Sequence, residues 1–158
     1  MAFLVLKVLH ILSATLFLGA GMASVFYKVT ADLSGDPRAV LFASRGIVRA
    51  DWLFTIPSGI ALPLTGITLC KVAGIALTTR WVLVGGSLYV LAGLTWLPAF
   101  WLQHVLRREA ERAVAEGTGP TEAFLRATRV WAALGVPSFL AAVGAITVMV
   151  GKGIVVGD

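Results

Sequence analysis

The residue of this sequence best suited to chemistry is a histidine inside an apolar segment. His10 lies in LKVLHILSATLFLGAG, residues 6–21, where the only other ionisable side chain is Lys7 at the start. Burying an ionisable group in such a segment is costly unless it has a partner, so each one is a functional candidate by default. A neutral imidazole can ligate a metal through one ring nitrogen or hydrogen-bond to polar neighbours. His10 is therefore either a haem or metal ligand or a structural histidine satisfied by polar partners.

Helical spacing predicts which way His10 points and what it meets. Its helical face continues through small residues such as Ser13, which let another helix approach closely, so the imidazole is predicted to face the bundle interior. At about 1.5 Å of rise per residue, His10 lies roughly 10–13 Å in from the end of its span. Thr65, Gly66 and Tyr89 fall at a similar depth on other spans. We expect Thr65 and Tyr89 to belong to the cofactor site, with Tyr89 able to hydrogen-bond the imidazole directly.

Asp51 and His104 mark a second polar region, near the opposite ends of two spans. In one interpretation Asp51 is an interfacial carboxylate paired with Arg49 or Arg129. In the other it forms a polar site with His104 at the cytoplasmic mouth, suited to proton exchange or substrate entry. His104 lies roughly 20 Å or more from His10 by the helix rise, so the two histidines cannot hold one metal within a monomer.

The composition indicates that these residues lie on membrane-spanning helices. Of 158 residues, 58% are hydrophobic and only 13% are charged, against about 25% charged in soluble domains. Four stretches lack Asp, Glu, Lys and Arg: residues 8–27, 52–70, 81–103 and 130–151. Each has about the 20 residues that a helix needs to cross the hydrocarbon core, and helices satisfy their own backbone there. The prediction is an all-α integral membrane four-helix bundle, with residues 1–158 forming a single transmembrane domain.

The basic residues predict the orientation of this bundle. Nine of the 13 lie between spans one and two or between spans three and four: Lys28, Arg38, Arg45, Arg49, Arg107, Arg108, Arg112, Arg126 and Arg129. The other four are Lys7, Lys71, Arg80 and Lys152. Because cytoplasmic loops carry the excess of Lys and Arg, both termini are expected to face outward from a bacterial inner (plasma) membrane. These charges favour contact with anionic lipid headgroups over nucleic acid.

The connections between spans contain helix signals of their own. Asp36 followed by Pro37 is typical of an N-cap and the first helical residue, and the apolar and basic residues that follow predict a short interfacial helix. The segment RREAERAVAEG extends the third span as a charged helix up to Gly117, and another helix is predicted to start near Thr121. We expect such interfacial helices in both cytoplasmic loops. The connection between spans two and three is short, so those spans are expected to be antiparallel neighbours.

Two resemblances bear on function. Over its whole length the chain resembles the integral membrane family called domain of unknown function 2269. The matching pieces are Lys7-x-x-His10, Ser34-Gly35-Asp36-Pro37, Ala50-Asp51-Trp52, Pro63-Leu-Thr-Gly66, Trp96-Leu-Pro98 and Trp101-Leu-Gln103. The first span, with Lys7-Val-Leu-His10 and the small residues after it, is similar to the first helix of HemJ-type protoporphyrinogen oxidases and of copper-resistance D membrane proteins. The HemJ resemblance implies that His10 ligates haem b. Lys71 is the nearest candidate for a lysine that those enzymes also require.

Three functional hypotheses remain open from the sequence. The first is a haem-b-binding membrane protein with a redox or porphyrin-related role and His10 as the ligand. The second is a module without a cofactor that assembles with itself or with another membrane protein. The third is copper handling by His10 with Met149, a thin ligand set for that metal. The substrate, the electron partner and any second axial ligand are not indicated by the residues.

Overall fold

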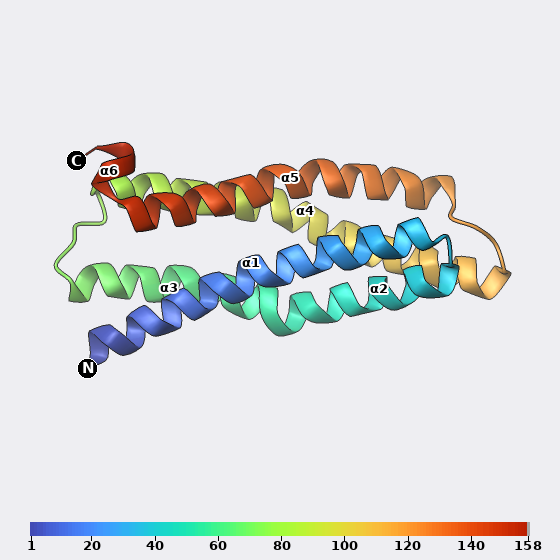
Figure 1. Cartoon of the computed structure of the whole chain (residues 1–158), viewed down its shortest axis with the longest axis horizontal. Coiled ribbons are helices and arrows are strands. Elements are labelled where there is room, and N and C mark those ends of the chain that lie inside the picture. The colour runs from blue at the N-terminus through green and yellow to red at the C-terminus, as the bar shows by residue number, and fades with distance from the viewer. Residues whose placement is uncertain (158) are drawn as a thin grey trace.

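The computed structural model describes residues 1–157, which form helices arranged along one long axis (Figure 1). In chain order these are α1 (Ala2–Ser34), α2 (Pro37–Ala50), the π-helical turn η1 (Asp51–Thr55), α3 (Ile56–Val72), α4 (Arg80–Glu116), α5 (Glu122–Gly151) and α6 (Gly153–Val156). Four continuous helical segments are long and apolar enough to cross a membrane, and each predicted span lies within one of them. The predicted all-α fold with four spanning helices is confirmed for these residues.

The helix ends follow the local sequence signals. Helix α1 ends at Gly35, whose φ of 67° is in the left-handed region that glycine adopts without steric cost. The Asp36 carboxylate then accepts a hydrogen bond from the Arg38 amide at 2.8 Å, with Pro37 as the first residue of α2. At the far end of α4, Gly117 has a φ of 65°, and the Thr121 side chain caps α5. The predicted helix signals at Asp36-Pro37, Gly117 and Thr121 are confirmed.

The Asp36 cap gives a first testable prediction. Asp36→Ala removes an acceptor for an otherwise unpaired amide at the start of α2, so the free energy of unfolding is expected to fall by about 1 kcal/mol. Reversible denaturation in detergent measures the difference. Asp36→Asn is the matched control, because its side-chain oxygen can still cap the helix. Equal stability of the alanine variant and the wild type would contradict a stabilising cap.

The second helical segment changes its geometry but does not end at Asp51–Thr55. Pro57 has no N–H, and its ring would clash with the carbonyl four residues earlier in a regular α-helix. In η1 the amide of Ile56 donates to the carbonyl of Asp51, five residues back, which is π-helical spacing. Helix α2 therefore continues through this wider turn into α3. The helix that starts at Pro37 thus leads into the second span, as expected from the sequence, and its position at the membrane interface stays a prediction.

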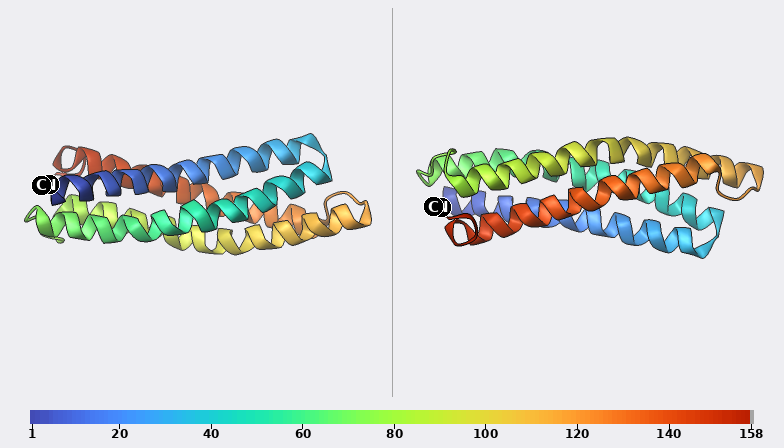
Figure 2. Two further views of the ribbon diagram at one scale, coloured as in Figure 1. Left: turned by 90° about the horizontal axis from the view of Figure 1, so that it is seen from below. Right: turned by 90° about the horizontal axis from the view of Figure 1, so that it is seen from above.

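The bundle has two unlike halves along its length. In the half that contains the chain termini, here the terminal half, α3 packs on α1 while α4 packs on α5 (Figures 1 and 2). In the other half, here the loop half, α2 takes the place of α3 and packs on both α1 and α4. The second and third spans run antiparallel as expected (Figure 1), but α3 does not pack closely against α4. Its main partner is α1, and α2 makes the contact with α4.

The well-packed core lies in the loop half. Its central cluster consists of Ala99, Leu106, Ala110, Phe124, Ala127 and Trp131. The alanines allow α4 and α5 to approach closely, and the large side chains fill the space that α2 encloses. In the terminal half few residues are buried, and on α3 these are Ser58 and Cys70. The two helix pairs of the terminal half are thus less tightly packed together than the four helices of the loop half.

Candidate functional site

The structure brings His10 and Thr65 into direct contact between α1 and α3. Nδ1 of His10 lies 2.8 Å from Oγ1 of Thr65, although the two residues are 55 positions apart in the chain. The depth argument from the sequence therefore identified a true neighbour. His10 is only half-buried, so its ring turns toward α3 and still borders open space.

The hydrogen bonds of Thr65 determine which ring nitrogen of His10 carries the proton. A threonine hydroxyl has one hydrogen to donate. Oγ1 of Thr65 donates it within its own helix, to the carbonyl of Ala61 at 2.6 Å. Thr65 must therefore accept from His10, with Nδ1–H as the donor. In a neutral imidazole this leaves the lone pair on Nε2. The backbone of Leu62 on α3 also lies within hydrogen-bonding reach of the ring.

Gly66 makes room for the imidazole. A Cβ atom built on Gly66 would lie 3.1 Å from Cε1 of His10, closer than ordinary van der Waals contact. The Cε1 edge of the ring therefore points at Gly66, a position where a larger residue would push the imidazole away. On the other helix pair, Gly85 of α4 is covered by the side chain of Met149 from α5. Met149 is the residue expected to pair with His10 in copper handling.

Tyr89 takes a different place from the one expected. Its hydroxyl donates to the carbonyl of Gly59 on α3 and not to His10. Phe17 of α1 packs on the same glycine, with 3.3 Å from Cε2 to a Cβ built there, and its ring centroid is 6.4 Å from that of Tyr89. The expected direct bond to His10 is therefore wrong. Tyr89 instead links α4 to α3 about two turns deeper in the bundle, where Pro63 has no N–H to donate to the Gly59 carbonyl.

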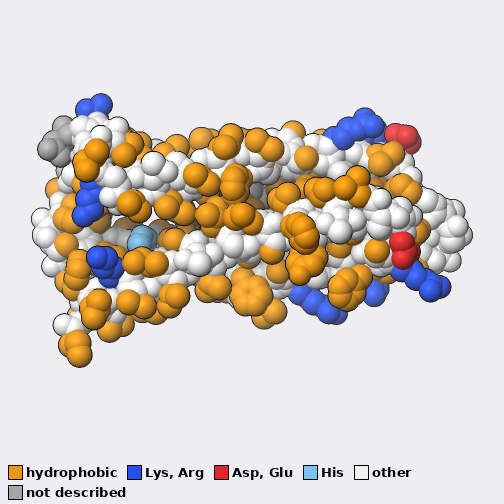
Figure 3. Space-filling view, viewed as in Figure 1, with side chains coloured by type: hydrophobic (Ala, Val, Ile, Leu, Met, Phe, Trp, Pro, Cys, Tyr) orange, Lys and Arg blue, Asp and Glu red, His pale blue; other side chains and the backbone are white. Residues whose placement is uncertain are grey.

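The surface around the histidine is hollowed. In the space-filling view a histidine side chain is visible in a recess of the terminal half, bordered mostly by hydrophobic side chains (Figure 3). Lys and Arg side chains lie toward the two ends of this face (Figure 3). The recess agrees with the looser packing between the α1–α3 pair and the α4–α5 pair.

Asp51, the first residue of η1, is buried in the loop half and is only 2% exposed. Thr55, Gln103 and His104 are the groups that lie close enough to act on its carboxyl. In the described chain no ion pair includes Asp51, so the expected pairing with an arginine is wrong. The alternative, a polar site with His104, fits the observed neighbours. Thr55 and Gln103 join this cluster because η1 turns Asp51 toward α4.

His104 lies between Asp51 and a group of aromatic side chains. Its Nδ1 lies 3.0 Å from the carbonyl of Phe100, one turn earlier on α4, and therefore donates to it. Its ring stacks edge-on against Phe100, with 4.8 Å between centroids, and lies 6.0 Å from Trp101. Trp52 also meets Phe100 at 5.9 Å. Aromatic clusters of this kind are typical of the membrane–water boundary.

Lys28 is a buried functional group that the sequence analysis did not single out. Its side chain is 3% exposed and forms an ion pair with Asp32, four residues later on α1. Nζ also donates to Oγ1 of Thr128 at 3.2 Å and lies 4.6 Å from the centre of the Phe124 ring. The i, i+4 spacing of Lys28 and Asp32 is a sequence signal for such a pair that the sequence analysis did not use. It did not indicate that the ammonium faces α5.

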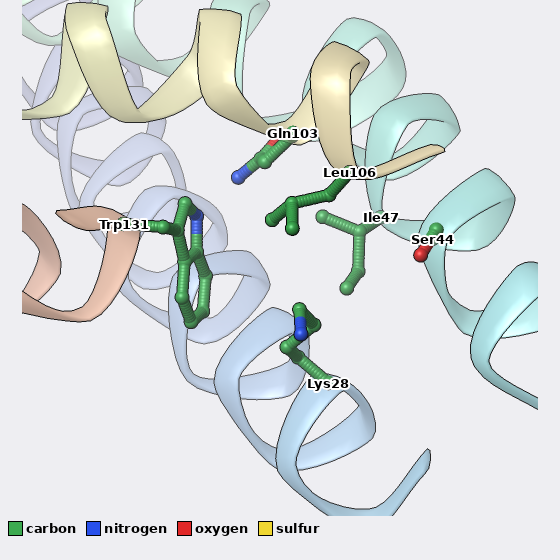
Figure 4. A pocket seen from close by; sticks show the side chains of 6 residues that line it. All are labelled: Lys28, Ser44, Ile47, Gln103, Leu106 and Trp131. Atoms are coloured by element: carbon green, nitrogen blue, oxygen red, sulfur yellow. The ribbon is translucent and has the colours of Figure 1, made fainter. Parts of the chain in front are cut away.

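A small cavity lies beside Lys28. Its volume of about 10 Å³ is close to the minimum that holds one water molecule. Figure 4 shows the lining residues Lys28, Ser44, Ile47, Gln103, Leu106 and Trp131 around it. Over the part of the chain that the structure describes, no three His, Cys, Asp or Glu side chains come together in a way that could hold a metal ion.

Comparison with known proteins supports the membrane assignment. A family model described as "Predicted integral membrane protein (DUF2269)" matches residues 4–153, nearly the whole chain. No curated protein and no solved structure matches the chain significantly. The matched region covers the four long apolar helices, except for the first two residues of α1, as well as His10, Thr65 and Asp51. The chain belongs to the DUF2269 family of integral membrane proteins.

Proposed function

We propose that this integral membrane protein binds haem b in the recess of the terminal half, with Nε2 of His10 as an axial ligand, and has a redox or porphyrin-related role. The observation that carries the proposal is the hydrogen-bond chain from His10 through Thr65 to the Ala61 carbonyl. It holds the imidazole as the Nδ1–H tautomer and leaves the Nε2 lone pair free. Haem-ligating histidines are oriented in the same way, by a hydrogen bond from the nitrogen that does not bind the metal.

The residues around His10 suit a flat apolar group with one ligand position. Gly66 leaves room for the ring beside α3, and His10 is only half-buried, so its ring stays accessible from the surface. Mostly hydrophobic side chains line the recess, which excludes water from a bound macrocycle (Figure 3). Thr65 fixes the ring orientation and raises the basicity of Nε2 through its hydrogen bond. Haem bound there would supply one-electron redox chemistry.

The proposed orientation puts this recess toward the outer side of a bacterial inner membrane. Both termini lie at the same end of the bundle (Figure 1). The charge-free segments are centred on the terminal half. Nine of the 13 basic residues lie near the loop end, where α1 is followed by α2 and α4 is followed by α5. A helix of 37 residues such as α4 is about 55 Å long, well beyond the ~30 Å hydrocarbon core. The loop end accordingly projects into the cytoplasm.

The visible absorption spectrum of the purified protein tests the proposal. The protein, isolated with haem present, is expected to show a Soret band that is lost in His10→Ala. The matched control is His104→Ala, because His104 is the only other histidine in the chain and should leave the band unchanged. Gly66→Val retains the imidazole but displaces it, and it is also expected to reduce haem binding at least tenfold.

Other outcomes would point to the rival functions. A colourless wild type that cannot be reconstituted with haem contradicts the proposal. If His10→Ala then changes only stability or oligomer size, the residue serves the packing of an assembly module. Metal analysis after copper loading separates the copper hypothesis, since stoichiometric copper lost in both His10→Ala and Met149→Leu would support that hypothesis and overturn the haem proposal.

A further inference from the structure

The cluster at η1 contains three buried oxygen atoms without partners. Asp51, Thr55 and Gln103 are 2%, 3% and 6% exposed. Oδ2 of Asp51, Oγ1 of Thr55 and Oε1 of Gln103 are each shielded from solvent and have no hydrogen-bond partner in the described chain. Buried polar atoms are almost always paired, so three orphans in one cluster require an explanation.

The hydrogen-bonding capacities of these atoms show what is missing. An ionised carboxylate oxygen and an amide oxygen can only accept, whereas a threonine hydroxyl can donate one hydrogen. Thr55 can therefore satisfy the Asp51 carboxylate but not Gln103 as well. Figure 4 shows the amide nitrogen of Gln103 turned toward the cavity and Trp131, and the amide oxygen has no donor in the described chain. The cluster therefore lacks one proton that could be shared between the two acceptors, Oδ2 of Asp51 and Oε1 of Gln103.

We propose that Asp51 is a proton-binding site, with the proton carried on Oδ2 and shared with Oε1 of Gln103. In this arrangement the Thr55 hydroxyl donates to Asp51, and the Asp51 carboxylic acid donates to Gln103. A single proton pairs all three oxygens and removes a buried negative charge that no salt bridge compensates. The wider backbone turn of η1 presents the carboxyl to α4, which is a common use of π-helical turns at functional sites.

Among the described residues no salt bridge includes this carboxyl, and His104 is the nearby group whose charge can act on it. From α4, His104 is the titratable neighbour, and its Nδ1 is committed to the Phe100 carbonyl. From α1, Lys28 is bound by Asp32 and Thr128. Arg107, one turn beyond Gln103, forms no ion pair with Asp51, and Arg49 on α2 is exposed. The aromatic residues around His104 place the proton site at the loop-end boundary of the apolar zone.

Infrared spectroscopy of the full-length protein in detergent tests the proposal. Near pH ~7 ordinary carboxyl groups are ionised, so a protonated carboxyl gives a separate C=O stretching band that shifts in D₂O. The wild type is expected to show this band and Asp51→Asn to lack it. Asp36→Asn, which changes an exposed capping carboxylate, is the matched control and should retain it.

A second variant makes the test independent of how Asp51→Asn folds. Gln103→Leu removes the proposed acceptor, so the band should remain but move to higher frequency. Absence of the band from the wild type would overturn the proposal, as would a band that persists in Asp51→Asn. A band that appears in choline buffer and disappears on adding sodium would also overturn it, in favour of a metal cation between the same oxygens. None of these results depends on whether haem binds at His10.

Discussion

Asp32→Ala is expected to destabilise the protein by about 3–5 kcal/mol, because it leaves a buried ammonium without its counter-ion. Lys28 is almost fully buried, with a side chain 3% exposed, and Asp32 is its only ion-pair partner among residues 1–157. The other contacts of Lys28, with Thr128 and the Phe124 ring, do not neutralise its charge. Thermal or chemical denaturation in detergent measures the loss.

Replacing the other member of the pair, Lys28, should lower the stability much less. Lys28→Met replaces the buried charge with an apolar side chain of similar length, and such replacements are often neutral or stabilising. Asp32 then loses its partner, but its side chain is 26% exposed and can be hydrated. The double variant Lys28→Met with Asp32→Ala should therefore recover most of the stability lost in Asp32→Ala alone. Equal damage from both single variants would show that the pair itself, and not the burial of Lys28, determines stability.

Trp131→Ala is expected to lower the free energy of unfolding by a similar amount, about 3–5 kcal/mol, because it empties the centre of the loop-half core. Trp131 is 8% exposed and packs with the cluster that α4 and α5 form. It also lines the small cavity beside Lys28, so its removal would enlarge an existing void (Figure 4). The denaturation midpoint and the heat-induced loss of helical circular dichroism report the change.

Trp101 provides the control for this prediction. It lies on the same bundle but is 66% exposed, so Trp101→Ala leaves no cavity behind. Its expected effect on stability is below about 1 kcal/mol, in line with surface positions generally. If Trp101→Ala were as destabilising as Trp131→Ala, the core would not be concentrated in the loop half.

Much of the local structure followed from the sequence alone. The lengths of the charge-free segments predicted four spanning helices, because a backbone in lipid must satisfy its own hydrogen bonds. Asp36, Pro37, Gly117 and Thr121 marked helix ends through local chemistry that does not depend on the rest of the fold. The depth of His10 likewise identified Thr65 as a neighbour, since helix rise is constant and both spans start at a boundary.

Only the tertiary structure decided which side chains turn inward at each level. Depth put Tyr89 near His10, but the rotation of α4 and the small Gly59 direct its hydroxyl to another carbonyl. Lys28 and Asp51 each lie at the end of a charge-free segment, and this position alone does not determine whether a side chain is exposed or buried. Their burial depends on α2 replacing α3 beside α4, and the π-helical turn before Pro57 sets the direction of Asp51. Helix periodicity is a local property, whereas the rotation of one helix against another arises from packing across the whole bundle.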